Sequence, residues 1–308
     1  MVFKTFDELI AAAKSKPSTA RMAVAAAGDS HTIEAVLMAR AEGIAEPVLV
    51  GDKAAIMEAL AEFNATVPEE DIYDVPDLAE SARVAVSLVV EGKADFLMKG
   101  KLDTGILLKA VVNKECGLGQ GRTMSHFTMF QVPGYHKLMV PVDGGMVTYP
   151  TLEQKKDIIM NTVDTLRAMG YDQPKVGVLA CVEKLNPKMP ETVEADALKQ
   201  MNRNGEITGC IVEGPISYDC AMDKEIADFK GFESPCAGDC DILVAPNIHA
   251  GNIMGKMLAV TAGAKMAGFI VGAKCPIAMT SRGSSVEEKY TSIVLAAVAA
   301  QGMAKLED

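Results

Sequence analysis

The sequence predicts a two-domain α/β protein whose mostly parallel sheets are covered by helices on both faces. Short apolar runs alternate with longer segments of helical period along most of the chain, which is the pattern of successive strand–helix–strand units. The runs are rich in Val, Ile, Leu and Met and show little alternation, as in strands that are buried on both faces. A length of 308 residues is enough for about two domains of ordinary size.

The individual elements follow from these two periodicities. Short apolar runs bounded by polar or turn-forming residues predict strands at residues 22–27, 47–50, 94–98, 126–130, 137–142, 175–180, 210–212, 241–245, 268–271 and 277–280. Longer segments with apolar residues at helical spacing predict helices at residues 30–42, 53–63, 78–91, 104–113, 151–169, 191–203, 252–266 and 285–303.

The domain boundaries are placed where this alternation is interrupted. The segment from Pro133 to Pro150 is rich in Pro and Gly, and we place the first crossing there. No repeat or low-complexity run marks the return, which we place near Gly268. The expected domains are therefore residues 1–141 with 269–308, and residues 142–268.

Composition excludes several classes of function. The net charge of −11 argues against binding to polyanions or membrane surfaces, and the low aromatic content, without Trp, argues against stacking on single-stranded nucleic acid. The N-terminal MVFKTFDELIAAAKSK does not resemble a signal peptide, and no apolar run is long enough to span a bilayer. The seven cysteines form no CxxC pair, so we expect reduced thiols in a cytoplasmic protein.

The most informative stretch is CPIAMTSRGSSVEEKYTSIVLAAVAA, residues 275–300. A short strand precedes a long helix, and SSVE matches a capping box in which Ser284 accepts from a first-turn N–H and Glu287 reaches back. A helix start attracts anions, and the Arg282 guanidinium and the open backbone of Gly283 both suit a phosphate. The alternative interpretation is a well-capped surface helix with a solvated arginine.

Three other segments carry candidate binding residues. In DFLMKGKLDTG, residues 95–105, Lys99 and Lys101 follow a strand at the edge where ligands of open α/β sheets collect. This is not a P-loop, and solvated lysines are the alternative. The segment after residues 241–245 contains Asn247, Gly251 and Asn252, and its amides can bind a ligand or cap the next helix. The last candidate is Ser125, which begins another apolar run and is not part of a GxSxG motif.

Taken together, these segments resemble the phosphate acetyltransferase and phosphate butyryltransferase family. The resemblance extends over nearly the whole chain, and its most specific parts are GPISYDCAMD, PNIHAGNIMGK and TSRGSSVEE. The segments MKGKLDTG, SHFTMFQVPGY and KLNPKMPET are most similar to the butyryl branch, as is the short overall length.

The family implies a fold of the isocitrate/isopropylmalate dehydrogenase type, an active site in the cleft between the domains, and a homodimer. In the acetyl branch a Ser-Arg pair and an Asp seven residues past the Ser are catalytic. Ser281 and Arg282 match the pair, whereas Glu288 replaces the Asp and lengthens the side chain by one methylene. Glu287 is therefore the alternative base. The resemblance places substrate-binding residues at Lys99, Lys101, Ser125, Asn247, Gly251, Asn252 and Gly283.

The implied reaction converts butyryl-CoA and inorganic phosphate into butyryl phosphate and CoA. Arg282, helped by Lys99 or Lys101, would hold the phosphate beside the thioester. A carboxylate, Glu288 or Glu287, would take a phosphate proton, and Ser281 would donate to the developing thiolate. Acyl-CoA and phosphate are the expected partners, with no metal and no permanently bound cofactor.

Three alternatives remain open at this point. The enzyme could be specific for acetyl-CoA, because each methylene of the acyl chain is worth only about 1–3 kcal/mol in a pocket. The chain could be a catalytically silent homologue that binds acyl-CoA. A 2-hydroxy acid dehydrogenase of the same fold group would need a cluster of metal-binding Asp residues and a nicotinamide site, and the sequence shows neither that cluster nor GxGxxG after a strand.

Overall fold

The chain forms two compact units. The computed structural model describes residues 2–16, 18–280 and 284–307. Unit 1 comprises Met1–Phe6 and Arg122–Met266, and unit 2 comprises Asp7–Gly121 and Ala267–Asp308. The return to unit 2 lies next to the expected boundary at 268/269. The first crossing, at 121/122, comes earlier than the expected 141/142, because Phe130 and Met139 exchange backbone hydrogen bonds of 2.7 and 3.0 Å within unit 1.

The strands of unit 2 lie in the order β3-β2-β1-β4-β11-β10. Neighbours are parallel, except that β10 and β11 are antiparallel. Leu97 of β4 lies opposite Ile277 of β11, so a strand that comes late in the sequence completes the middle of the sheet. The strands are β1 (Ala20–Ala25), β2 (Ala45–Gly51), β3 (Ile72–Asp74), β4 (Phe96–Lys99), β10 (Lys265–Val271) and β11 (Ile277–Ala278).

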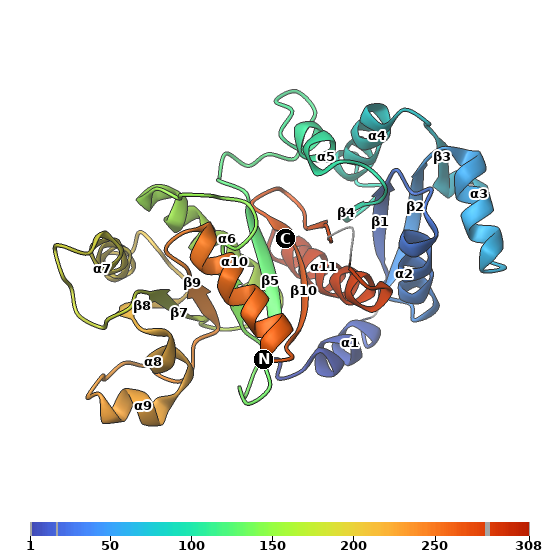
Figure 1. Ribbon diagram of the computed structural model, residues 1–308. Helices are drawn as coiled ribbons and strands as arrows, with labels where there is room; N and C mark the ends of the chain where they lie inside the picture. Colours follow the sequence, from blue (N-terminus) through green and yellow to red (C-terminus); the bar gives the residue numbers. More distant parts are fainter. Residues whose placement is uncertain (1, 17, 281–283, 308) are drawn as a thin grey trace. The chain divides into compact units, whose positions relative to one another are not determined.

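Helices cover this sheet on its two faces, as the apolar strands require. α2 packs against α11, and α4 packs against α5 and contacts β1 and β2 (Figure 1). The caps of α2, α3 and α4 are aspartates whose side chains accept from first-turn N–H groups. The helices of this part are α1 (Phe6–Lys14), α2 (Ser30–Ala41), α3 (Lys53–Glu62), α4 (Leu78–Val90), α5 (Thr104–Val111) and α11 (Val286–Glu307).

Unit 1 contains a four-stranded parallel sheet in the order β6-β9-β7-β8. The strands of this sheet are β6 (Val140–Val142), β7 (Lys175–Leu179), β8 (Ile211–Ile216) and β9 (Ile242–Val244). A further strand of unit 1, β5 (Ser125–Gln131), lies outside this sheet. Its helices are α6 (Leu152–Ala168), α7 (Pro190–Arg203), α8 (Tyr218–Met222), α9 (Lys224–Phe229) and α10 (Ile248–Lys256). The expected fold class, α/β with mostly parallel sheets and helices, is confirmed in both units.

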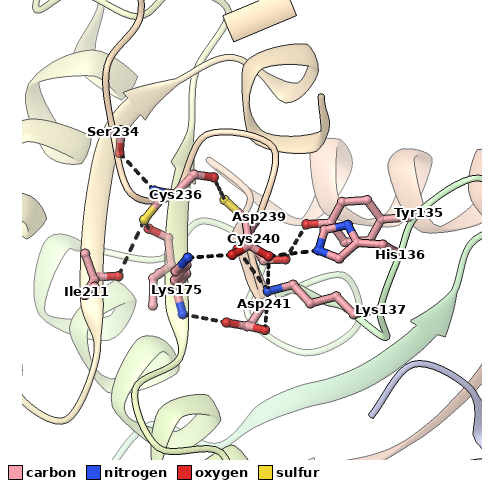
Figure 2. Close-up of polar contacts among 11 residues, drawn as sticks. Tyr135, His136, Lys137, Lys175, Ile211, Ser234, Cys236, Asp239, Cys240 and Asp241 are labelled. Carbon is pink, nitrogen blue, oxygen red and sulfur yellow. Dashed lines mark hydrogen bonds and ion pairs between the residues drawn. The ribbon is translucent and has the colours of Figure 1, made fainter. Parts of the chain in front are cut away.

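A network of charged side chains holds the starts of β7 and β9 (Figure 2). The buried Lys137 ammonium lies 2.8 Å from Asp239 Oδ1 and 2.7 Å from Asp241 Oδ1. Asp241 also accepts from the backbone N–H of Lys175 at 2.8 Å. Burial alone would raise the pKa of Asp239, but hydrogen bonds from Lys137, Lys175 and His136 outweigh that effect and lower the pKa.

Several predicted element boundaries are wrong for local reasons. The helix predicted at residues 252–266 begins at Ile248, because Asn247 caps it by accepting from two first-turn N–H groups. It ends as an α-helix at Lys256, continues as a π-helical segment through Thr261, and is followed by β10. The short elements α1, α8, α9 and β3 were not predicted. None of the helices within the described ranges has the length and apolar character needed to cross a membrane.

Candidate functional site

Unit 2 contains a cavity of about 730 Å³ that we call the lysine pocket. It lies at the carboxyl ends of β4 and β11, beside the starts of α2 and α11, which is the edge of an open α/β sheet where ligands bind. Asp29, Thr32 and Asp103 contribute polar groups to its wall. The residues that define the pocket are Lys99, Gly100, Lys101, Thr280, Ser284 and Lys289.

The backbone around Gly100 fixes both lysines of the β4 end. The N–H groups of Gly100 and Lys101 donate to the carbonyls of Ala25 and Ala26, at 2.8 and 2.9 Å. A Cβ on Gly100 would lie 2.3 Å from the Ala26 carbonyl oxygen, so this close approach requires glycine. The half-buried Lys99 donates to the carbonyls of Gly100 and Leu102, and Lys101 is exposed. The structure thus brings the two predicted lysines into one pocket.

The start of α11 lies on the same pocket, but its cap differs from the prediction. Ser285 Oγ accepts from the N–H of Glu288 at 3.1 Å, so the predicted cap at Ser284 is wrong by one residue. The Ser284 hydroxyl instead donates to Glu288 Oε1 at 2.8 Å. Two adjacent serines fit the same sequence pattern, and only the backbone geometry distinguishes them.

Lys289 is a pocket residue that the sequence analysis missed. It is only 8% exposed, and its Nζ donates to the carbonyl of Ser284 at 3.2 Å. A lysine on a helix is ordinarily solvated, so Lys289 was not among the residues predicted to bind a ligand. The signal that could have identified it is its place on the first turns of α11, next to Glu288.

The three residues at the strand–helix junction, Ser281, Arg282 and Gly283, lie outside the described residues. The proposed base, Glu288, is partly buried and is oriented by the Ser284 hydroxyl. Its alternative, Glu287, is exposed. The catalytic roles of these residues stay predictions.

In unit 1, the predicted amides and glycine join the start of α10 to the loop after β6. Asn247 is the cap of α10, which is the alternative role that its sequence allowed. A Cβ on Gly251 would lie 2.4 Å from the Asp143 carbonyl oxygen, and the Asn252 side chain donates to the Gly144 carbonyl at 2.9 Å. Contact of these residues with a substrate stays a prediction.

Ser125 occupies the interior of unit 1. It is fully buried, and its hydroxyl accepts from Asn161 Nδ2 at 3.4 Å. The next residue, His126, donates its backbone N–H to the buried Asp143 at 3.2 Å. Burial lowers the pKa of the His126 imidazole, and the neighbouring Asp143 charge opposes that change. Ser125 therefore helps to pack this unit, and its predicted role in substrate binding stays a prediction.

Unit 1 also has a cavity of about 800 Å³ that we call the apolar pocket. It lies at the carboxyl ends of β7 and β9 and against α10 and the π-helical segment. The described residues that line it include neither Lys nor Arg. The residues used below are Ala180, Cys181, Ala245, Ala250, Met254 and Met257.

One cluster of carboxylate and thiol groups in the described part of the chain has a spacing that could hold a metal ion, formed by Glu183, Asp219 and Cys220. A lysine already compensates the negative charge of this cluster, because Lys230 Nζ lies 2.9 Å from Glu183 and 2.8 Å from Asp219. Hydrogen bonds from Lys230 and Ser217 lower the pKa of Asp219 to about 2. The cluster is therefore an ion-pair network at the start of α8.

The fold and the lysine pocket define a class, namely α/β proteins with a cavity where strand ends meet a helix start, which is where open α/β sheets bind their ligands. Residues 77–297 match the model of the phosphate acetyl/butaryl transferase family. The chain belongs to this family.

Relatives of both branches match nearly the whole chain. A phosphate butyryltransferase from Clostridium acetobutylicum is 41% identical over 97% of this chain and 99% of its own length. A phosphate acetyltransferase from Thermotoga maritima is 43% identical over 95% of this chain and 98% of its own length. Sequence identity alone therefore does not decide whether the chain belongs to the butyryl or the acetyl branch.

Solved structures agree with the fold. A branched-chain phosphotransacylase from Enterococcus faecalis V583 has a TM-score of 0.79 and 29% identity, and the match covers 92% of this chain and 99% of the other. A 4-hydroxythreonine-4-phosphate dehydrogenase from Klebsiella pneumoniae has a TM-score of 0.57 at 16% identity over 92% of this chain and 100% of the other. The second likeness shows only that the fold is shared with dehydrogenases.

Proposed function

We propose that this chain is an acyltransferase that moves a short acyl group between coenzyme A and inorganic phosphate, with butyryl as the preferred group. The observation that carries the proposal is the lysine pocket, because Lys99 and Lys101 at the end of β4 and Lys289 near the start of α11 line one cavity. Full-length similarity to phosphate butyryltransferase and phosphate acetyltransferase supports the same reaction.

We divide the chemistry among lysines of the lysine pocket and the catalytic residues expected from the sequence. Arg282, helped by Lys99 or Lys101, holds the phosphate dianion, and the α11 start adds its partial positive charge. Glu288 takes a phosphate proton as a phosphate oxygen attacks the thioester carbonyl. The C–S bond then breaks, and Ser281 donates a hydrogen bond to the departing thiolate. Holding both substrates in this orientation supplies up to roughly 7–11 kcal/mol of the barrier reduction in favourable cases.

The apolar pocket suits the acyl chain and the thiol end of the pantetheine arm. Its lining offers methyl and thioether groups from Ala180, Ala250, Met254 and Met257, and no cation for a phosphate. Methionine adapts to chains of different length. A butyryl group uses more of this surface than an acetyl group does, which favours butyryl by about 1–3 kcal/mol for each methylene that is buried.

The remaining features of the proposal concern the whole assembly. We propose a cytoplasmic homodimer. CoA enters and leaves as a substrate, so neither a permanently bound cofactor nor a metal is needed. Acetyl-CoA specificity is the alternative that the second relative favours.

The test is release of free CoA thiol from acetyl-CoA, propionyl-CoA and butyryl-CoA, with and without inorganic phosphate and without added metal. We expect release that requires phosphate, with the highest kcat/KM for butyryl-CoA. A maximum at acetyl-CoA would assign the chain to acetyl transfer. No release from any thioester, with CoA binding intact, would show a silent binding protein and would remove the catalytic roles of Ser281 and Glu288.

A further inference from the structure

Lys289 has an environment that is unusual for a lysine. Its side chain is more than nine-tenths buried, yet the acceptor that the structure gives it is the neutral carbonyl of Ser284. Among the ion pairs of the described residues, none includes Lys289. A buried ammonium is costly unless a negative charge compensates it. The site therefore favours an anion beside Lys289.

The lysine pocket supplies the space for that anion. Lys289 lies within the first turns of α11 and lines the pocket with Lys99 and Lys101. An ammonium has three donors, and the Ser284 carbonyl accepts from one of them. The other two can donate to a ligand. The partial positive charge of the helix start acts on the same space.

The position of Ser284 indicates which anion this is. The Ser284 hydroxyl donates to Glu288, and its carbonyl accepts from Lys289. One residue therefore holds the proposed base and this cation next to each other. The phosphate that reacts must lie beside the base, whereas the phosphates of CoA are remote from the thioester.

We infer that Lys289 is a substrate-binding residue that donates to an oxygen of the transferred phosphate group. The ligand is inorganic phosphate in one direction and the phosphoryl group of the acyl phosphate in the other. This inference rests on the proposed acyl transfer and adds a third lysine to those expected from the sequence.

The experiment compares Lys289→Met, which keeps the volume of the buried stem, with Lys289→Arg, which keeps the charge. Lys305→Met, at an exposed position near the end of α11, is the control. We expect Lys289→Met to raise the KM for phosphate and for butyryl phosphate by about tenfold or more. The KM for butyryl-CoA should change by less than about twofold. Lys289→Arg should recover part of the loss, and the control should match the wild type.

Three results would overturn the inference. The first is an unchanged phosphate KM in Lys289→Met. The second is an equal rise of the phosphate and CoA KM values together with a lower Tm, which would mean that Lys289 only braces Ser284. The third is a rise confined to CoA, which would assign the cation to the phosphates of CoA.

A binding measurement separates this inference from the proposed reaction. Inorganic phosphate should raise the Tm of the wild type and of Lys305→Met, but not that of Lys289→Met, because ligands stabilise the state that binds them. If the wild type shows this stabilisation without phosphate-dependent thiol release, the proposed reaction fails while the anion site stands. Equal stabilisation of all three proteins would refute the role of Lys289.

Discussion

At the scale of single residues, Ser284 connects the groups that matter most for the proposed chemistry. Its hydroxyl holds a carboxylate and its carbonyl holds an ammonium. A base and a cation fixed through one residue can keep their separation when a substrate enters. Such preorganisation is the usual source of electrostatic stabilisation in enzymes. This arrangement also distinguishes Glu288 from its exposed neighbour Glu287.

We predict that Glu288→Gln lowers kcat for phosphate-dependent thiol release by about 10²–10⁴-fold, because a positioned general base contributes on that order. Glu287→Gln is the matched control and should retain kcat within about twofold. Both variants are measured at saturating butyryl-CoA and phosphate. The reverse pattern, with an active Glu288→Gln and an inactive Glu287→Gln, would move the base to Glu287.

At the scale of elements, the polar network of unit 1 determines where its parallel strands begin. Lys137 lies just before β6, and Asp239 and Asp241 lie just before β9. The side chains of Lys137 and Asp241 are 6% and 5% exposed. This is the end of the sheet opposite to the apolar pocket, so its charges serve the strands rather than a ligand.

We predict that Lys137→Met lowers the free energy of unfolding by about 3–5 kcal/mol, because it leaves the Asp241 carboxylate buried without its cation. Lys175→Met, which removes a more exposed partner of Asp239, should cost about 1 kcal/mol or less. Urea unfolding near pH 7 measures both, and the double variant Lys137→Met/Asp241→Asn should recover part of the loss. A cost below about 1 kcal/mol for Lys137→Met would contradict this account.

The same network gives an expected dependence on pH. Since the pKa of Asp239 is lower in the folded protein than in an unfolded chain, the unfolded state binds its proton first as the pH falls. The stabilisation is therefore complete above the ordinary aspartate range and is lost at more acidic pH. Lys137→Met should show a weaker loss of stability with acid than the wild type does.

The sequence predicted most strands and helices because these elements are long, apolar and regularly spaced. It could not give the direction of β11, because an apolar run of residues 277–280 has the same pattern whether its neighbour is parallel or antiparallel. It also missed the burial of Lys289, which depends on tertiary packing around the lysine pocket. The apolar pocket combines residues 179–181 with residues 245–262, and only the folded chain brings these segments together.

At the scale of the molecule, the two units carry different kinds of surface. Unit 2 has the lysine pocket, whereas the pocket of unit 1 is apolar and includes neither Lys nor Arg among the described residues that line it. The net charge of −11 means that anionic substrates are attracted by local groups and not by the whole surface. The phosphate and the organic part of acyl-CoA should therefore affect different segments.

We predict that phosphate alone slows amide hydrogen exchange in residues 99–103 and 284–290, by up to about tenfold at ten times its Kd. Butyryl-CoA should additionally slow exchange in residues 179–181 and 245–262. Sodium chloride at equal ionic strength is the control. Protection by phosphate in residues 245–262 without protection in residues 284–290 would contradict the assignment of the phosphate to the lysine pocket.

The pairing of β4 with β11 has a consequence for synthesis on the ribosome. One edge of β4 is satisfied early by β1, but its other partner, β11, is translated only after residues 122–266. Residues 122–266 are one continuous segment that contains nearly all of unit 1, and they can fold while the nascent chain still lacks β11. A stalled or truncated chain would thus present the unpaired edge of β4 in the middle of an incomplete sheet, where other chains can add and aggregate.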